Sequence, residues 1–167
     1  IIQAAFGWLD YHLYEFEFYH KKSSKRSILL DGYEDPDGDP NAPLARDYRL
    51  CDLFPEFQRV FYNYDFGDGW RIRIQLESEE HNCEEILPTF LRGSGDAPPE
   101  DVGGPWGFAD FVEIVSNPQH EEYQFIKEWA EDQEWRVFDF DAISEAVESS
   151  LQGFSSYERS ILMGDNI

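Results

Sequence analysis

Alternation of apolar and polar side chains is clearest between Val60 and Glu77. Every second residue is apolar or aromatic from Val60 to Phe66, and again from Trp70 to Leu76. A period of two is typical of a half-buried β-strand, and a short glycine-containing connector between two such runs favours a hairpin. We therefore predict a β-hairpin whose tip, Gly67-Asp68-Gly69, uses the glycines for positive φ angles.

Other segments show the same period or a helical one. Alternation predicts a strand over Tyr11–Tyr19, and we expect short strands at Ser27–Leu30 and Ile86–Leu91. Apolar residues at helical spacing predict helices over Phe108–Val115, from Pro118 to about Ala130, and around Ile143–Leu151. Asp139 or Asp141 is expected to cap the last helix, and Ile1–Gly7 resembles the end of another.

The order of these elements predicts the fold class. Strands come first and helices last, without the βαβ alternation of a parallel sheet. We expect an α+β fold, an antiparallel sheet with a central hairpin that is backed by the C-terminal helices. The length of 167 residues and the 41% hydrophobic content suit one domain over residues 1–167. Because the chain opens on a helix end and not on methionine, we expect part of the N-terminus to be missing.

The net negative charge of the chain limits the classes of partner that it can bind. The formal net charge is -22, and such a field repels phosphate backbones unless a local basic patch opposes it. The one candidate patch, Lys21-Lys22-Ser-Ser-Lys25-Arg26, is more typical of a solvated hairpin loop. We therefore expect a protein or a basic peptide as partner, and not nucleic acid.

Cysteine usage and hydropathy suggest the compartment. Only Cys51 and Cys83 occur, and the chain shows neither a signal peptide nor an apolar run long enough to cross a bilayer. We expect a reduced cytoplasmic setting with no membrane contact.

Local catalytic motifs are missing from the sequence, so we assign no catalytic residue. No nucleophile elbow, P-loop, Cys-x-x-Cys or His-Glu-x-x-His occurs. The segment Asp35–Asn41 superficially matches a calcium loop, but Pro40 stands where glycine must make the sharp turn.

Five polar residues remain as candidates for a site. One imidazole with several carboxylates could hold magnesium or manganese, although turn and cap hydrogen bonds are the commoner use of such residues in so acidic a chain. Trp70 and Trp106 belong more often to a core than to a ligand-stacking surface, and we expect Trp70 to be buried against the helix that carries Phe111 and Val115. The five polar candidates are His12, Asp65, Asp68, Glu100 and Asp101.

Three motifs resemble one family. They are Gln-Ala-Ala-Phe-Gly-Trp-Leu-Asp-Tyr-His-Leu-Tyr-Glu-Phe from Gln3, Tyr-Asp-Phe-Gly-Asp-Gly-Trp from Tyr64, and Ala-Pro-Pro-Glu-Asp-Val-Gly-Gly-Pro-Trp-Gly-Phe from Ala97. In this order they resemble the plasmid pRiA4b ORF-3-like family, whose members look like passenger proteins of plasmids and insertion elements. The resemblance implies an α+β fold with one or two strands before Ile1, and it implies no activity.

The chain also departs from the pattern of this family. Relatives often carry histidine at the positions of Tyr14 and Ile72 and cysteines near Phe90 and Ala97, so the resemblance does not extend to a soft-ligand metal site here. The positions that match the family pattern are Asp65, Gly67, Asp68, Trp70, Pro98, Pro99, Glu100, Asp101, Gly103 and Gly104.

Two functions follow as hypotheses. The first is a non-enzymatic interaction module of a mobile element, with an acidic, aromatic-lined groove formed by His12, Asp65, Asp68, Trp70, Glu100, Asp101 and Trp106. The second is a hydrolase or nuclease accessory whose carboxylates hold magnesium or manganese. Carboxylates that converge would favour the second, and carboxylates bound to backbone amides would favour the first.

Overall fold

The computed structural model describes residues 1–19, 26–30, 43–48, 53–54, 56–57, 59–78 and 87–152. Contacts divide the chain into two compact units. Unit 1 comprises Ile1–Tyr11 and Leu87–Gly153, and unit 2 comprises His12–Ile86 and Phe154–Ile167. One domain over residues 1–167 stays a prediction. The calcium-like loop, both cysteines and most of the predicted basic cluster lie outside the described residues.

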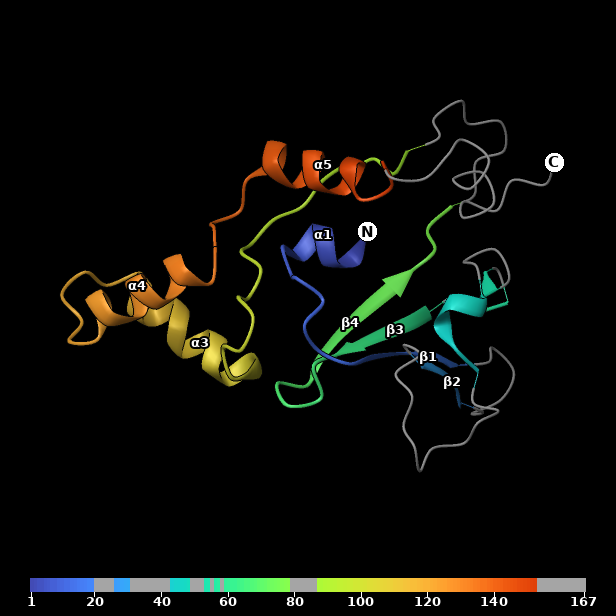
Figure 1. Cartoon of the computed structure of the whole chain (residues 1–167), viewed down its shortest axis with the longest axis horizontal. Coiled ribbons are helices and arrows are strands. Elements are labelled where there is room, and N and C mark those ends of the chain that lie inside the picture. Colours follow the sequence, from blue (N-terminus) through green and yellow to red (C-terminus); the bar gives the residue numbers. More distant parts are fainter. Residues whose placement is uncertain are drawn as a thin grey trace. The chain divides into compact units, whose positions relative to one another are not determined.

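Unit 2 holds a four-stranded antiparallel sheet (Figure 1). The spatial order is β2-β1-β3-β4, and a 3-10 helix, Ala45–Asp47, lies between β2 and β3 in the chain. Together with the helices of unit 1, this sheet confirms the α+β class. The strands are β1 Tyr14–Tyr19, β2 Arg26–Leu30, β3 Arg59–Tyr64 and β4 Trp70–Gln75.

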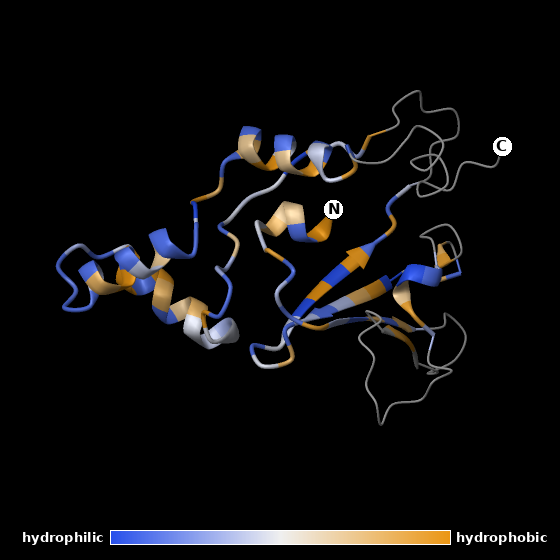
Figure 2. Cartoon of the chain, in the orientation of Figure 1, coloured by the Kyte–Doolittle hydropathy of each residue, from blue (hydrophilic) through white to orange (hydrophobic). Residues whose placement is uncertain are grey.

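The period of two places one face of this sheet in a core. Val60, Tyr62 and Tyr64 are all buried on β3, as the alternation predicts, and Figure 2 shows the alternating hydropathy along β4. A second side of the core comes from the segment before β3. The main cluster contains Phe18, Leu29, Phe57 and Val60, with Phe16, Ala45, Leu53, Phe54 and Ile74 packed against it.

The hairpin tip differs from the predicted one. β3 ends at Tyr64, and the turn takes positive φ at Asp65 (51°) and Gly69 (71°). Asp65 Oδ1 accepts hydrogen bonds from the amides of Gly67 (2.9 Å) and Asp68 (3.3 Å). Aspartate tolerates the left-handed region because its short side chain makes such local bonds. The turn is therefore longer than Gly67-Asp68-Gly69 and begins on an aspartate.

The opposite face of the sheet carries a buried carboxylate. Glu17 is only 3% exposed, and its Oε2 lies 2.7 Å from Arg71 Nη2. The Tyr19 hydroxyl donates to Glu17 Oε1 at 2.6 Å, and the Arg71 guanidinium lies 4.0 Å from the centroid of the Phe61 ring. This ion pair links β1 to β4 across the intervening strand β3.

Trp70 is half-buried and stands outside the main core cluster. We expected a fully buried indole, because alternation places Trp70 on the same face as Ile72 and Ile74. As the first residue of β4, it lies at the end of the sheet and not over its centre. Its expected packing against the helix that carries Phe111 and Val115 joins the two units and stays a prediction.

Unit 1 contains four α-helices among its described residues. In this unit α1 packs against α5 and α3 against α4 (Figure 1). The Asp139 carboxylate caps α5 by accepting from the amides of Asp141 (3.0 Å) and Ala142 (3.1 Å), as predicted. None of the helices in the described part of the chain is long and apolar enough to cross a bilayer. The helices are α1 Ile2–Phe6, α3 Gly104–Val115, α4 Tyr123–Asp132 and α5 Phe140–Ser149.

Three predicted elements of unit 1 need correction. The helix expected from Pro118 begins only at Tyr123, because side chains within residues 117–122 accept from nearby backbone amides and hold that stretch in turns. Residues 87–91 form no strand, and Pro88 lacks the amide hydrogen that a paired strand needs there. α3 begins at Gly104 instead of Phe108, because Pro105 stands at the start of the helix, where its missing amide hydrogen is no loss. Within this unit Phe111 is buried and its ring lies edge-on to Trp129 (5.9 Å) and Trp135 (4.8 Å).

Candidate binding groove

The loop 96–100 of unit 1 is held from one side by the residues that follow α1. Gly7 ends this helix with φ 71°, and the Trp8 amide closes the turn onto Gln3 O at 3.0 Å. The Trp8 indole is buried, stacks on Phe6 and donates from Nε1 to Pro98 O at 2.9 Å. The next amide, of Leu9, donates to Glu100 Oε1 at 2.9 Å.

A second segment holds the same loop from the other side. The indole of Trp135 donates from Nε1 to Ala97 O at 2.8 Å, and the Phe138 amide donates to Asp96 Oδ1 at 2.6 Å. Two indoles therefore bind consecutive carbonyls, those of residues 97 and 98. A loop fixed in this way from two sides presents a preformed surface.

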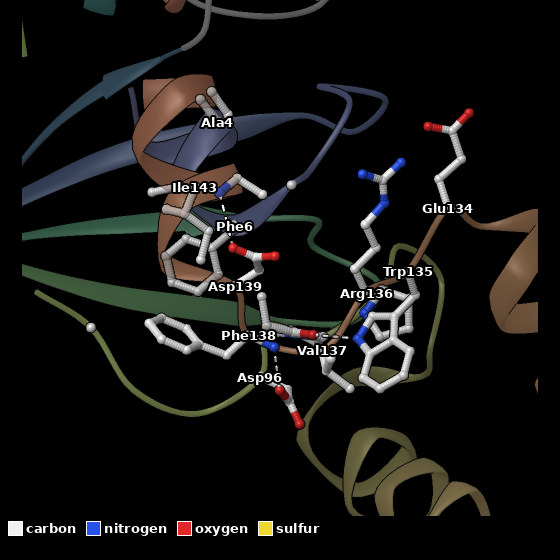
Figure 3. Close-up of a pocket in the computed structure, with 18 of the residues that line it drawn as sticks. Ala4, Phe6, Asp96, Glu134, Trp135, Arg136, Val137, Phe138, Asp139 and Ile143 are labelled. Carbon is white, nitrogen blue, oxygen red and sulfur yellow. Dashed lines mark hydrogen bonds between the residues drawn. The ribbon is translucent and has the colours of Figure 1, made fainter. Parts of the chain in front are cut away.

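A cavity of about 450 Å³ lies among these parts of unit 1, which we call the groove. Its volume is within the usual range of ligand pockets, about 300–1,000 Å³. Figure 3 shows Ala4 and Phe6 on α1 beside Ile143 on α5, with the segment 134–139 along the other wall. Small and apolar residues make most of the lining, among them Ala4, Phe6, Phe90, Ala97, Trp135, Phe138, Ala142, Ile143 and Ala146.

Gly93 shows how closely the aromatic residues of the groove approach the loop. A Cβ atom at this position would lie 2.5 Å from Phe90 Cζ and 3.0 Å from Phe138 Cε2. Because real Cβ atoms do not come this near to a ring carbon, only glycine lets both rings sit against the backbone here.

Charge in the groove is mostly negative. The lining contains four carboxylates, those of Asp96, Glu100, Glu134 and Asp139, against one guanidinium, that of Arg136. Asp96 and Asp139 each use Oδ1 to accept from backbone amides, and Glu100 uses Oε1. A carboxylate oxygen has further lone pairs, so these groups can still accept from a bound cation. The groove therefore combines apolar walls with a surplus of acidic groups.

Glu134 has an unusual backbone conformation. Its φ is 55°, and its amide donates to Glu131 O (3.1 Å) while that of Trp135 donates to Ala130 O (2.9 Å). These bonds form the motif that commonly ends a helix on a left-handed glycine. A glutamate here has a strained backbone, and this exposed residue lines the groove.

We expect Glu134→Gly to raise the free energy of unfolding by roughly 0.5–1 kcal/mol, because glycine adopts positive φ without steric cost. The same variant should bind basic peptides more weakly, since it removes a carboxylate from the groove. Glu134→Ala is the matched control, because it removes the charge but keeps a Cβ atom. Chemical denaturation that showed Glu134→Gly to be less stable than Glu134→Ala would mean that the backbone strain is not relieved.

The predicted site residues divide between the two units. His12, Asp65, Asp68 and Trp70 lie in unit 2, whereas Glu100, Asp101 and Trp106 lie in unit 1. A groove or a magnesium or manganese site built from both sets stays a prediction. Glu100 alone among the seven lines the groove of unit 1.

Within unit 2, the structure brings together two of the predicted residues around the hairpin tip. His12 Nε2 lies 3.8 Å from Asp65 Oδ2, and the imidazole meets the Tyr64 ring edge-on at 5.8 Å. Asp65 is buried, while Asp68 and Trp70 are half-buried. His12 and Asp65 thus form a pair through Asp65 Oδ2, while Asp65 Oδ1 accepts the hydrogen bonds of the turn.

Within unit 1, Asp101 is exposed and has a φ of 56° next to the buried Glu100. Trp106 is 86% exposed on α3 and does not line the groove. Sequence reasoning missed the segment 134–139, although one signal was present. Charged and apolar residues alternate in Glu-Trp-Arg-Val, from residue 134 to residue 137, between two helices, and a connecting loop does not need such a pattern.

Comparisons with known proteins agree with this architecture. The family model described as Plasmid pRiA4b ORF-3-like protein matches residues 1–146. A protein of Sinorhizobium fredii (strain NBRC 101917 / NGR234), Uncharacterized protein y4hQ, is 34% identical over 151 residues, which are 89% of this chain and 74% of that protein.

A solved structure shows a similar fold. It is the crystal structure of the protein of unknown function MM3350 from Methanosarcina mazei Go1, with a TM-score of 0.64 and 30% sequence identity. The match covers 83% of this chain and 75% of that one. Neither protein's name states a ligand, a partner or a reaction.

Proposed function

The chain belongs to the plasmid pRiA4b ORF-3-like family, and from that premise we propose that it is a non-enzymatic interaction module whose groove in unit 1 binds a basic peptide segment of another protein. The observation that carries the proposal is the lining of the groove, where four carboxylates and one guanidinium surround apolar walls. The interaction would serve a mobile element, in keeping with the plasmid protein that gives the family its name.

Electrostatics favours a cationic occupant. With a formal charge of -22, the chain attracts basic segments over a distance set by the ionic strength, and the acidic groove gives them a place to bind. Apolar walls then supply the short-range part of the affinity, because a bound side chain loses contact with water.

The geometry of the predicted carboxylates also favours binding over catalysis. Asp65 Oδ1 accepts from two turn amides, and Glu100 Oε1 accepts from the Leu9 amide. Both groups therefore stabilise backbone conformations, which is the arrangement that the interaction hypothesis predicts. A magnesium- or manganese-dependent accessory remains the alternative, and it requires these oxygens to converge on an ion.

Isosteric removal of charge tests the proposal. The triple variant Asp96→Asn, Glu134→Gln, Asp139→Asn keeps an acceptor oxygen at each amide contact while it removes three charges from the groove. We expect the dissociation constant for a Lys/Arg-rich peptide to rise about tenfold, since each exposed charge contributes about 0.2–1 kcal/mol. Calorimetric titration at two salt concentrations measures both the affinity and its salt dependence.

The control carries three changes of the same kind on exposed acidic residues outside the groove: Asp110→Asn, Glu113→Gln and Glu148→Gln. It alters the net charge equally but leaves the groove intact. Equal loss of affinity in both triple variants would show that the peptide responds only to net charge, and it would contradict the assignment of the groove.

A further inference from the structure

A second cavity of unit 1 shares a wall with the groove. It has a volume of about 290 Å³ and lies among α3, α4 and the segment that follows α4. Trp135 and Val137 line both cavities. The remaining lining of the second cavity consists of Val115, Tyr123, Lys127, Ala130 and Glu131.

The two residues of the shared wall differ, because Trp135 is fixed by its contacts and Val137 is exposed. Trp135 is fixed by its hydrogen bond to Ala97 O and by its edge-on contact with Phe111. Val137 is 64% exposed, although it is an aliphatic residue between two hollows. An exposed valine that lines two neighbouring cavities suits the docking of an extended chain that enters both.

The two cavities differ in charge. The groove has a surplus of carboxylates, whereas the charged residues of the second cavity, Lys127 and Glu131, neutralise each other at 3.8 Å. The rest of the second lining is aliphatic or aromatic. A ligand that occupies both cavities therefore needs cations at one end and apolar side chains at the other.

We propose that the occupant is an extended bipartite peptide that crosses Val137, with its basic half over the groove and its apolar half in the second cavity. The inference rests on the proposed function and deepens it, because it names the form of the partner. Lysine and arginine side chains of the basic half face Glu134, Asp139 and Asp96. Leucine or isoleucine side chains of the apolar half lie between α3 and α4.

Four synthetic peptides separate the inference from the proposed function. The parent joins Lys-Arg-Lys to Leu-Ile-Leu through a glycine, the second replaces the apolar half with Ser-Gly-Ser, and the third replaces the basic half. The fourth has the composition of the parent in scrambled order. Calorimetry measures the affinities, and nitrogen–proton correlation spectra locate the contacts through the Trp135 indole signal and the amides of Val115 and Tyr123.

We expect the peptide with Ser-Gly-Ser to bind at least about tenfold more weakly than the parent, since it buries no leucine or isoleucine side chain in the second cavity. This peptide should still shift the indole signal of Trp135 but leave the amide signals of Val115 and Tyr123 unchanged. The scrambled peptide should also bind more weakly than the parent. If the Ser-Gly-Ser and scrambled peptides bind as well as the parent, the bipartite inference is wrong while the groove stands. If none of the peptides with a basic half binds, the proposed function itself fails.

Two exposed valines provide a matched pair of protein variants. Val137→Ser replaces the apolar surface shared by the two cavities with a hydroxyl group, and Val112→Ser changes an exposed valine on α3 that lines neither of them. We expect only Val137→Ser to weaken the binding of the parent peptide. It should have little effect on the binding of the Ser-Gly-Ser peptide. Equal effects of the two valine variants on the parent peptide would overturn the proposed crossing point.

Discussion

Arg71→Met is expected to lower the free energy of unfolding by about 2–3 kcal/mol, whereas Arg73→Met should change it by less than about 0.5 kcal/mol. Both arginines point to the same face of β4, at alternate positions, and both are exposed at least in part. The difference lies in the partner. Arg71 neutralises the buried Glu17, and among the described residues Arg73 makes no ion pair.

Burial of Glu17 explains the size of the effect. Removing one partner of a buried pair costs roughly 3–5 kcal/mol because it leaves an uncompensated charge away from water. Arg71 is itself 48% exposed, so solvent screens part of its attraction and the expected loss is smaller. The methionine keeps most of the aliphatic contact with Phe61, so the loss reports mainly on the charge.

A double-mutant cycle with Glu17→Gln completes this test. If the unpaired carboxylate causes the loss, Glu17→Gln should recover part of the stability of Arg71→Met, because the amide is neutral and can still accept from the Tyr19 hydroxyl. Urea denaturation followed by circular dichroism provides all four free energies. Strictly additive losses would show that the two side chains do not interact.

Alternation in the sequence was sufficient to predict the strands because each of them buries one face, and two of the three pairings, β1 with β2 and β3 with β4, join neighbours in the chain. The pairing of β1 with β3 crosses over β2 in the sequence, and no local pattern encodes it. β3 and β4 follow each other across a five-residue turn, so local periodicity determines both their positions and their buried side. The turn itself was less predictable. Glycine was expected at positive φ, but Asp65 takes that role through its own hydrogen bonds to Gly67 and Asp68.

The groove could not be predicted because contacts between distant segments create it. Trp8 and Trp135 reach the same loop from residues about ninety and forty positions away, and no local pattern encodes that meeting. Sequence motifs did single out Pro98, Pro99 and Glu100 as positions that match the family pattern, and the structure buries all three. Trp106 stands in the same motif yet is exposed, because its position on α3 points it away from Phe111.

Trp8→Ala should lower the free energy of unfolding by roughly 3–5 kcal/mol, the usual cost of removing a buried large aromatic side chain. Trp106→Ala is the matched control and should change it by less than about 0.5 kcal/mol, because that indole is 86% exposed. The two variants remove the same atoms from unit 1, so their difference isolates burial and the bond to Pro98 O.

The intermediate variant Trp8→Phe separates the two contributions of this indole. Phenylalanine keeps much of the apolar contact with Phe6 but cannot donate to Pro98 O, so a loss of about 1–3 kcal/mol is expected from the unsatisfied carbonyl. Because Trp8 holds the loop that lines the groove, Trp8→Phe should also weaken the binding of the basic peptide, measured at a temperature where the variant remains folded. Thermal and urea denaturation measure the stabilities, and calorimetry measures the binding. A Trp8→Phe variant that lost stability but bound the peptide as tightly as the parent would show that the groove does not depend on this anchor.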